Sequence, residues 1–150
     1  MSLAATTWDM PSAYGAGNFI SKAYAAFGED VSKRTSGDLA ITLHPAGSLY
    51  SGGDILRAVR EGQVPIGGRF LGAHSKQVPL LGLDTVPFLA TTRAQSRKLY
   101  DVSKDAIGAA LDEIGLKLLF APVWPPQGLF SKKEVKTVDD MNGVKFRAYD

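Results

Sequence analysis

The sequence has 150 residues, of which 45% are hydrophobic, with no cysteine and a formal net charge of +2 at pH 7. This composition predicts a globular core and excludes disulfide bonds and thiolate metal sites. Basic residues are spread among acidic ones, which argues against a nucleic-acid partner, because such a partner needs clustered positive charge. No uninterrupted apolar run is long enough to span a bilayer.

The two ends of the sequence carry expectations of their own. Met1-Ser2-Leu3 has neither the basic residue nor the apolar run of a signal peptide, so we interpret it as an addition that replaces a removed leader. The sequence stops at Asp150, directly after a strand-like run, which indicates a truncated polypeptide.

The first 62 residues predict two strands and two helices. Residues 6–10 are a short strand candidate, and apolar residues at every fourth position over residues 19–31 predict an amphipathic helix. Gly37 stands where a left-handed helix cap is expected. Residues 39–44 alternate between apolar and polar types, as in a half-buried strand, and residues 55–59 predict a short helix.

The middle of the sequence predicts a further strand and a long helix. Residues 64–68 fit a short buried strand, which Pro65 restricts to an edge or irregular position. Thr92 and Gln95 predict a capping box at the start of a helix whose apolar residues extend over residues 99–114.

Residues 116–123 are the most continuous apolar strand candidate, and residues 144–148 alternate as a last strand. The resulting alternation of strands and helices predicts an α/β fold with a largely parallel sheet and helices on both faces. Ligands gather at the carboxyl ends of the strands in such sheets. We therefore expect a site in the loops that follow Met10, His44, Gly68 and Val123.

The motifs of several enzyme classes are missing. There is no phosphate-binding P-loop and no serine elbow, and the start of a dinucleotide fingerprint at residues 15–17 fails because Ile20 replaces its third glycine. His44 and His74 are the only histidines, and they lack the spacing of metal ligands. We therefore expect no metal, no cofactor and no catalysis, but binding alone.

Three aromatic residues are candidates for the walls of a binding site. Trp124 follows the 116–123 segment and precedes two prolines, so it is either a preorganised pocket wall or a core tryptophan beneath the sheet. Tyr14 and Phe70 follow strand candidates, where they either line a cleft or cap the core.

Polar candidates accompany these aromatic residues. Arg147 lies in an otherwise apolar strand candidate, where its guanidinium suits a carboxylate ligand, although a salt bridge to Asp150 or simple exposure would also explain it. The Gln127 amide can hydrogen-bond a carboxylate or a hydroxyl, or it is a solvated loop residue. Arg69, next to Phe70, is a second candidate cation.

Five passages, at residues 33–41, 44–49, 55–62, 86–88 and 140–147, match a family pattern in order and spacing. The last, Asp-Met-Asn-Gly-Val-Lys-Phe-Arg, is the most specific and ends at Arg147. Together these passages resemble the DctP-like solute-binding receptors of tripartite ATP-independent periplasmic (TRAP) transporters.

This resemblance implies a periplasmic binding protein-like fold of two α/β lobes that close around a solute at a hinge. Residues 4–122 would form the first lobe, and residues 123–150 would cross into the second. The family implies a periplasmic, non-enzymatic receptor that binds a small organic carboxylate and works with TRAP permease subunits. The arginine matching Arg147 would pair with the ligand carboxylate, whereas Gln127 replaces the family's second common arginine.

The aromatic candidates favour a monocarboxylate with an apolar or aromatic body. The alternatives are an amino-acid receptor of another transporter class, an α/β enzyme with an unrecognised site, and an isolated structural or interaction domain. An amino-acid receptor would need an acidic group for the ligand ammonium, and an enzyme would reveal itself by turnover.

Overall fold

The computed structural model describes residues 5–147. Met1-Ser2-Leu3, which we interpreted as an addition, therefore lies outside the described residues. The same holds for Ala148, the last residue of the expected final strand, and for Asp150.

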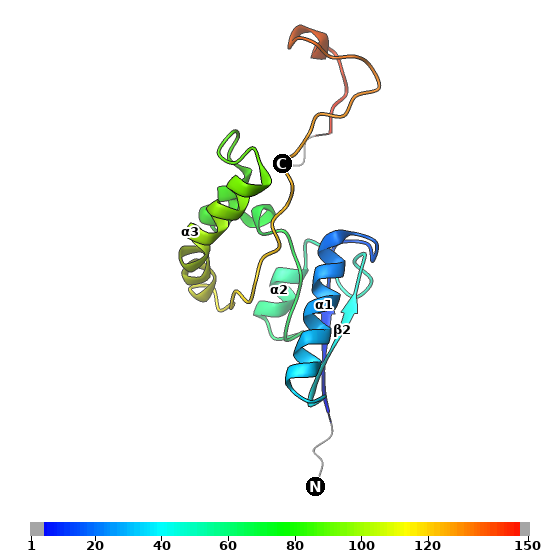
Figure 1. The fold of residues 1–150 in the computed structure, drawn as a ribbon, viewed down its shortest axis with the longest axis vertical. Coiled ribbons are helices and arrows are strands. Elements are labelled where there is room, and N and C mark those ends of the chain that lie inside the picture. The colour runs from blue at the N-terminus through cyan, green and yellow to red at the C-terminus, as the bar shows by residue number, and fades with distance from the viewer. Residues whose placement is uncertain (1–4, 148–150) are drawn as a thin grey trace.

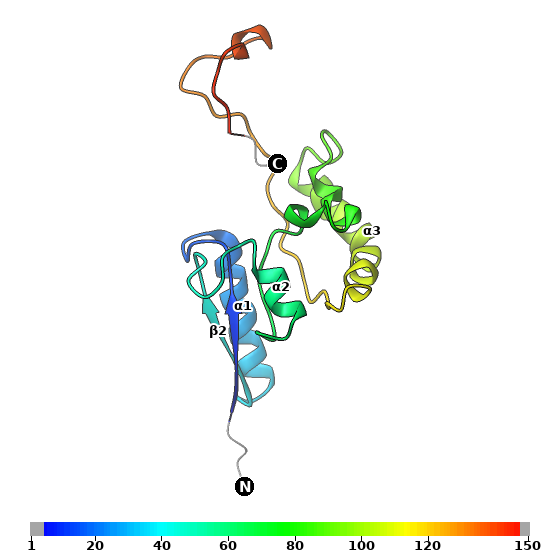
Figure 2. The same ribbon diagram turned by 180° about the vertical axis from the view of Figure 1, so that it is seen from behind.

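The chain begins with a β-α-β unit that carries the only sheet among the described residues. Strand β1 (Thr6–Pro11) pairs in parallel with β2 (Leu39–His44), and helix α1 (Phe19–Arg34) connects them. Helix α1 covers one face of the pair, since it lies in front of β1 in Figure 1 and behind it in Figure 2. Asn18 caps the helix by accepting a hydrogen bond from the Ile20 amide at 2.9 Å.

The loop between α1 and β2 confirms the expected glycine cap. Gly37 has a φ of +87°, a left-handed conformation that a side chain would strain. Its amide donates to the Ser32 carbonyl at 2.8 Å, which satisfies one of the last carbonyls of α1.

Helices follow the β-α-β unit. They are α2 (Ile55–Arg60), the 3-10 helices η1 (Leu71–His74) and η2 (Pro79–Thr85), and α3 (Arg93–Asp112). The predicted capping box is confirmed: Thr92 Oγ1 accepts from the Gln95 amide at 3.2 Å, and Gln95 Oε1 accepts from the Thr92 amide at 3.0 Å.

Three strand predictions are wrong in this structure. Residues 64–68 form bends with a single parallel bridge between Ser12 and Gly68, although Val64 and Ile66 are buried as expected. Residues 116–123 and 144–147 form no ladder. A strand needs a neighbouring strand for its backbone hydrogen bonds, and within residues 5–147 the sheet contains only β1 and β2.

The core lies between the sheet and α1, around the buried side chains of Met10, Ile20, Tyr24 and Ile66. A Cβ atom added to Gly68 would overlap the Tyr24 ring. The backbone at residue 68 therefore packs so close to this ring that only glycine fits. Every second residue of the segment 114–120 is half-buried, so one side of this segment packs against the rest of the chain.

From residue 125 the chain leaves this body as an arm, which rises away from the helices in Figure 1 and Figure 2. Its residues are mostly exposed, and its one helical turn is η3 (Asp139–Met141). No helix in the described part of the chain combines the length and apolarity that crossing a membrane requires.

Candidate ligand-binding site

Trp124 is the centre of an aromatic cluster, which we define as Tyr14, Phe19, Phe70 and Trp124. The ring centroids of Tyr14 and Phe19 lie 5.2 Å and 5.1 Å from that of Trp124, and the Phe70 centroid lies 6.4 Å from it. All three pairs meet edge to face, an arrangement that contributes beyond the area buried.

The cluster joins the three aromatic residues that the sequence singled out, which lie far apart along the chain. Sequence reasoning missed Phe19, because its place in the apolar period of α1 indicated an ordinary core residue. The one available signal was its position at the first turn of the helix, directly after the glycine-containing loop that carries Tyr14.

The loop after β1 holds Tyr14 in place by backbone hydrogen bonds. The Tyr14 carbonyl accepts from Ser21 Oγ at 3.0 Å and from the Ala46 amide at 2.8 Å, and the Tyr14 amide donates to Ser12 Oγ at 3.3 Å. The loop is thereby tied to the first turns of α1 and to the loop after β2. Such fixed backbone positions keep an aromatic wall preorganised for a ligand.

Phe70 reaches the cluster from a segment that runs beside the end of β1. The Gly68 amide donates to the Pro11 carbonyl at 2.8 Å, next to the Ser12–Gly68 bridge. Segments at residues 12–14, 45–53 and 68–70 therefore meet near the carboxyl ends of the parallel strands. This is the edge at which the sequence predicted a site.

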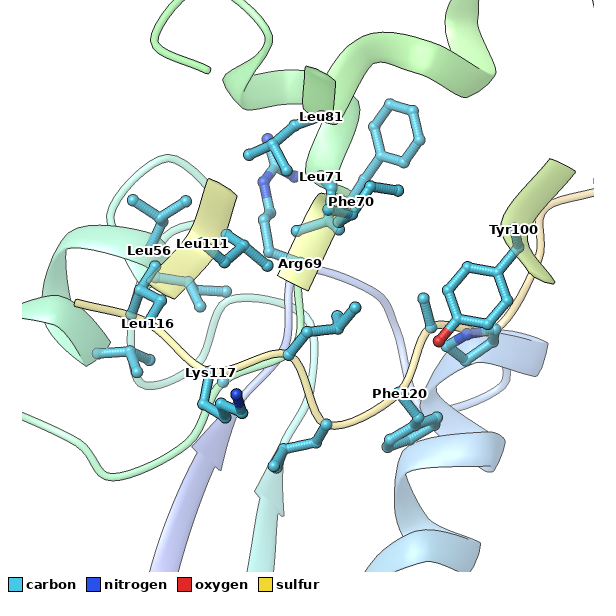
Figure 3. Close-up of a pocket in the computed structure, with 18 of the residues that line it drawn as sticks. Leu56, Arg69, Phe70, Leu71, Leu81, Tyr100, Leu111, Leu116, Lys117 and Phe120 are labelled. Carbon is cyan, nitrogen blue, oxygen red and sulfur yellow. The ribbon is translucent and has the colours of Figure 1, made fainter. Parts of the chain in front are cut away.

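A pocket of about 530 Å³ opens beside the cluster, a volume in the range of small-molecule sites. Leucine and other apolar side chains dominate its lining, as the close-up in Figure 3 shows. Its polar members include Arg69, Asp84, Ser96, Tyr100 and Lys117. The pocket thus offers apolar burial with a few polar contacts.

Burial changes the titration of two of the pocket's residues. It raises the pKa of the Tyr24 hydroxyl far above its ordinary value. It also raises the pKa of the Asp84 carboxyl, although Asp84 keeps contact with solvent at the rim.

Gln127 and Arg147 lie outside the cluster. Both are exposed residues of the arm, and neither lines the pocket. The structure therefore brings together Tyr14, Phe70 and Trp124 but does not bring the two polar candidates to them. Within residues 5–147, no group of three or more histidine, aspartate or glutamate side chains is placed to hold a metal ion.

Comparison with known proteins identifies a family that this sequence matches. The sequence profile of DctP, bacterial extracellular solute-binding protein family 7, matches residues 12–150. The family is one of solute-binding receptors.

Solved structures with the same fold include a TRAP solute binding protein from an unidentified marine microbe, specific for pyroglutamate and crystallised with co-purified pyroglutamate. Its identity to this chain is 47%, with a TM-score of 0.91, over 97% of this chain and 48% of that one.

Two extracytoplasmic solute receptors of Bordetella pertussis, DctP6 and DctP7, both described as binding pyroglutamic acid, are also similar. DctP6 is 40% identical with a TM-score of 0.87, over 91% of this chain and 45% of that one. DctP7 is 33% identical with a TM-score of 0.92, over 97% of this chain and 48% of that one.

This chain spans about half the length of these relatives. Their fold is the two-lobed fold of TRAP periplasmic binding proteins, which confirms the predicted fold class and the resemblance seen in the sequence. On the family match and on these three likenesses, the chain belongs to the DctP family of bacterial extracellular solute-binding proteins, family 7.

Proposed function

We propose that this chain forms the first lobe, and the start of the second, of a periplasmic TRAP receptor that binds a cyclic monocarboxylate of the pyroglutamate type. The ligand-binding side of the first lobe is the edge where the loops after β1 and β2 meet residues 68–70. The observation that carries the proposal is the aromatic cluster, which lies at this edge beside an apolar pocket.

The choice of pyroglutamate is supported by the three similar receptors, which share 33–47% identity with this chain over nearly all its length. Pyroglutamate is a five-membered lactam with one carboxylate and no ammonium group. Its ring methylenes suit the aromatic walls, and its carboxylate needs a cation. A charge-assisted hydrogen bond contributes about 1.5–3 kcal/mol, so the remaining affinity comes from burial and preorganisation.

Arg147 remains the predicted carboxylate contact from the second lobe. It is an exposed residue of the arm, outside the first-lobe cluster, so it would reach the ligand only when the two lobes approach. Hinge closure around the solute would achieve this, and the closed form would be the state that the permease subunits recognise. Gln127, also on the arm, is proposed to contact the ligand in the same closed state.

The lining of the pocket favours this ligand over a free amino acid. An amino-acid receptor needs acidic groups placed for the ligand ammonium, and among the described residues the pocket lining contains a single acid, Asp84, whose side chain is exposed. A lactam nitrogen is neutral and makes no such demand. The receptor role also predicts no turnover, which an assay with the bound solute would check.

Isothermal titration calorimetry of the full-length protein tests this proposal. L-Pyroglutamate should bind with one-to-one stoichiometry, whereas L-proline, which has the same ring with an ammonium in place of the lactam, should bind far more weakly. Malonate serves as the dicarboxylate control. Binding of malonate or proline in preference to pyroglutamate would contradict the proposal.

A further inference from the structure

Arg69 has a guanidinium group at the meeting point of the three segments that form the candidate binding edge. A Cβ atom built on Gly52 would lie 2.9 Å from Arg69 Nη1 and 3.0 Å from the Ala13 Cβ atom. Ala13 follows β1, Gly52 follows β2, and Arg69 itself follows the Ser12–Gly68 bridge. The guanidinium therefore lies against the Gly52 backbone, in space that the missing side chain leaves open.

The positive charge of Arg69 has no acidic partner in the described part of the chain. Its Nε atom is buried without a hydrogen-bond partner, and no ion pair among residues 5–147 includes it. Buried guanidinium donors are normally paired, because an unpaired charged donor loses its hydration without compensation.

His74 does not neutralise this charge. Its buried Nε2 atom also has no hydrogen-bond partner within residues 5–147. Burial, and secondarily the charge of Arg69, lowers the pKa of the His74 ring, so the ring is neutral at neutral pH. The surroundings of Arg69 therefore present a cation and a neutral polar ring without an anion.

Arg69 also lies next to the aromatic wall. Phe70, its neighbour in sequence, contacts Trp124, and all three residues line the same pocket. Figure 3 shows Arg69 and Phe70 among the residues of this pocket, with apolar side chains around them. A cation beside aromatic rings is the combination that suits an organic carboxylate with an apolar body.

We propose that Arg69 is a ligand-binding residue of the first lobe, which pairs with the carboxylate of the solute. This inference rests on the proposed function and deepens it, because it assigns a cation to the lobe that carries the aromatic cluster. The carboxylate would pair with the guanidinium of Arg69, and Arg147 would add a contact from the other lobe on closure.

The test is calorimetric titration of the full-length protein with L-pyroglutamate and with L-pyroglutamamide, in which an uncharged amide replaces the carboxylate. Arg69→Gln should weaken L-pyroglutamate binding roughly 10- to 150-fold, the loss of one charge-assisted pair. It should leave amide binding nearly unchanged, so the preference for the charged ligand collapses. Arg60→Gln, at an exposed arginine at the end of α2, is the matched control and should bind like the wild type.

Gly52→Ala provides a second variant that keeps the arginine. The new Cβ atom would displace the guanidinium from its position, so L-pyroglutamate affinity should fall while the thermal melting profile stays close to that of the wild type. This variant decides the question if Arg69→Gln does not fold.

The outcomes separate the two proposals. Wild-type protein that binds no pyroglutamate contradicts the proposed function itself. Wild-type protein that binds it, with Arg69→Gln of equal affinity and equal preference over the amide, overturns the role of Arg69 alone. Equal affinity in Gly52→Ala, where Arg69→Gln does not fold, overturns it as well.

Discussion

The body at residues 6–124 and the arm at residues 125–147 differ in how their structure is determined. In the body, a β-α-β unit, helix caps and a buried core hold the loops that carry Tyr14, Phe70 and Trp124. In the arm, most side chains are exposed, and the regular structure is the single helical turn η3. The Asp140 carboxylate accepts a hydrogen bond from the Thr137 amide at 2.8 Å just before this turn. Candidate residues in the body are therefore positioned by contacts within it, whereas Gln127 and Arg147 would reach a ligand there only through the lobe closure that we propose.

The variant with the largest expected effect on stability is Trp124→Ala, which tests the difference between body and arm. Trp124→Ala removes three ring contacts and should lower the free energy of unfolding by about 3–5 kcal/mol. In the 150-residue chain, Phe130→Ala removes an aromatic residue of the arm that is 91% exposed and should change stability by no more than about 0.5 kcal/mol. Urea denaturation of both variants checks the difference, and equal losses would contradict the distinction between body and arm.

The next effect concerns the close approach at Gly68. Gly68→Ala forces a Cβ atom into the Tyr24 ring and should destabilise the body by about 1–3 kcal/mol. Gly108→Ala is the matched control, because a Cβ atom there meets nothing within 4 Å and lies within α3. That control should stabilise the protein by about 0.5–1 kcal/mol. Thermal unfolding measures the change in stability of both variants. An unchanged stability in Gly68→Ala would contradict the close packing of Gly68 against Tyr24.

The capping box of α3 predicts a smaller effect. Thr92→Ala removes the hydroxyl that accepts from the Gln95 amide, which should cost about 1 kcal/mol of stability. Thr92→Ser keeps a hydroxyl and should restore most of the loss. Chemical denaturation followed by circular dichroism measures both, and an equal loss in the serine variant would argue against the cap.

The smallest effect is a pH dependence at His74. Because burial lowers its pKa from the ordinary 6.5, the folded state favours the neutral ring. Its contribution to stability is therefore complete above the unfolded pKa and is lost as the pH falls below about 6.5. Wild-type protein should lose more unfolding free energy between pH 7 and pH 5 than His74→Gln, and parallel profiles would exclude His74 as the titrating group.

Local rules predicted the helix caps of the body well. The Gly37 cap and the Thr92–Gln95 box depend on residues a few positions apart, so the sequence contains their physical cause. The convergence of Tyr14, Phe70 and Trp124 was expected from the rule that loops at the carboxyl ends of parallel strands lie near each other, although only Tyr14 follows a strand of the described sheet.

Non-local pairing explains where prediction failed. Residues 116–123 have the apolar run of a strand, and alternate side chains at residues 114–120 are half-buried, yet no strand of the described chain pairs with them. Sequence periodicity reports which side chains face a core, but it does not supply the neighbouring strand that a ladder requires. The sequence could not predict that Arg69 lacks an acidic partner either, because this depends on which side chains surround Arg69 in the folded structure.

The most direct test of the central claim is a crystal structure of the full-length protein grown with L-pyroglutamate. The account predicts that the lactam ring contacts Trp124 and Phe70 and that its carboxylate pairs with Arg69, at the carboxyl ends of β1 and β2. A ligand bound elsewhere, without contact to the aromatic cluster, would contradict it.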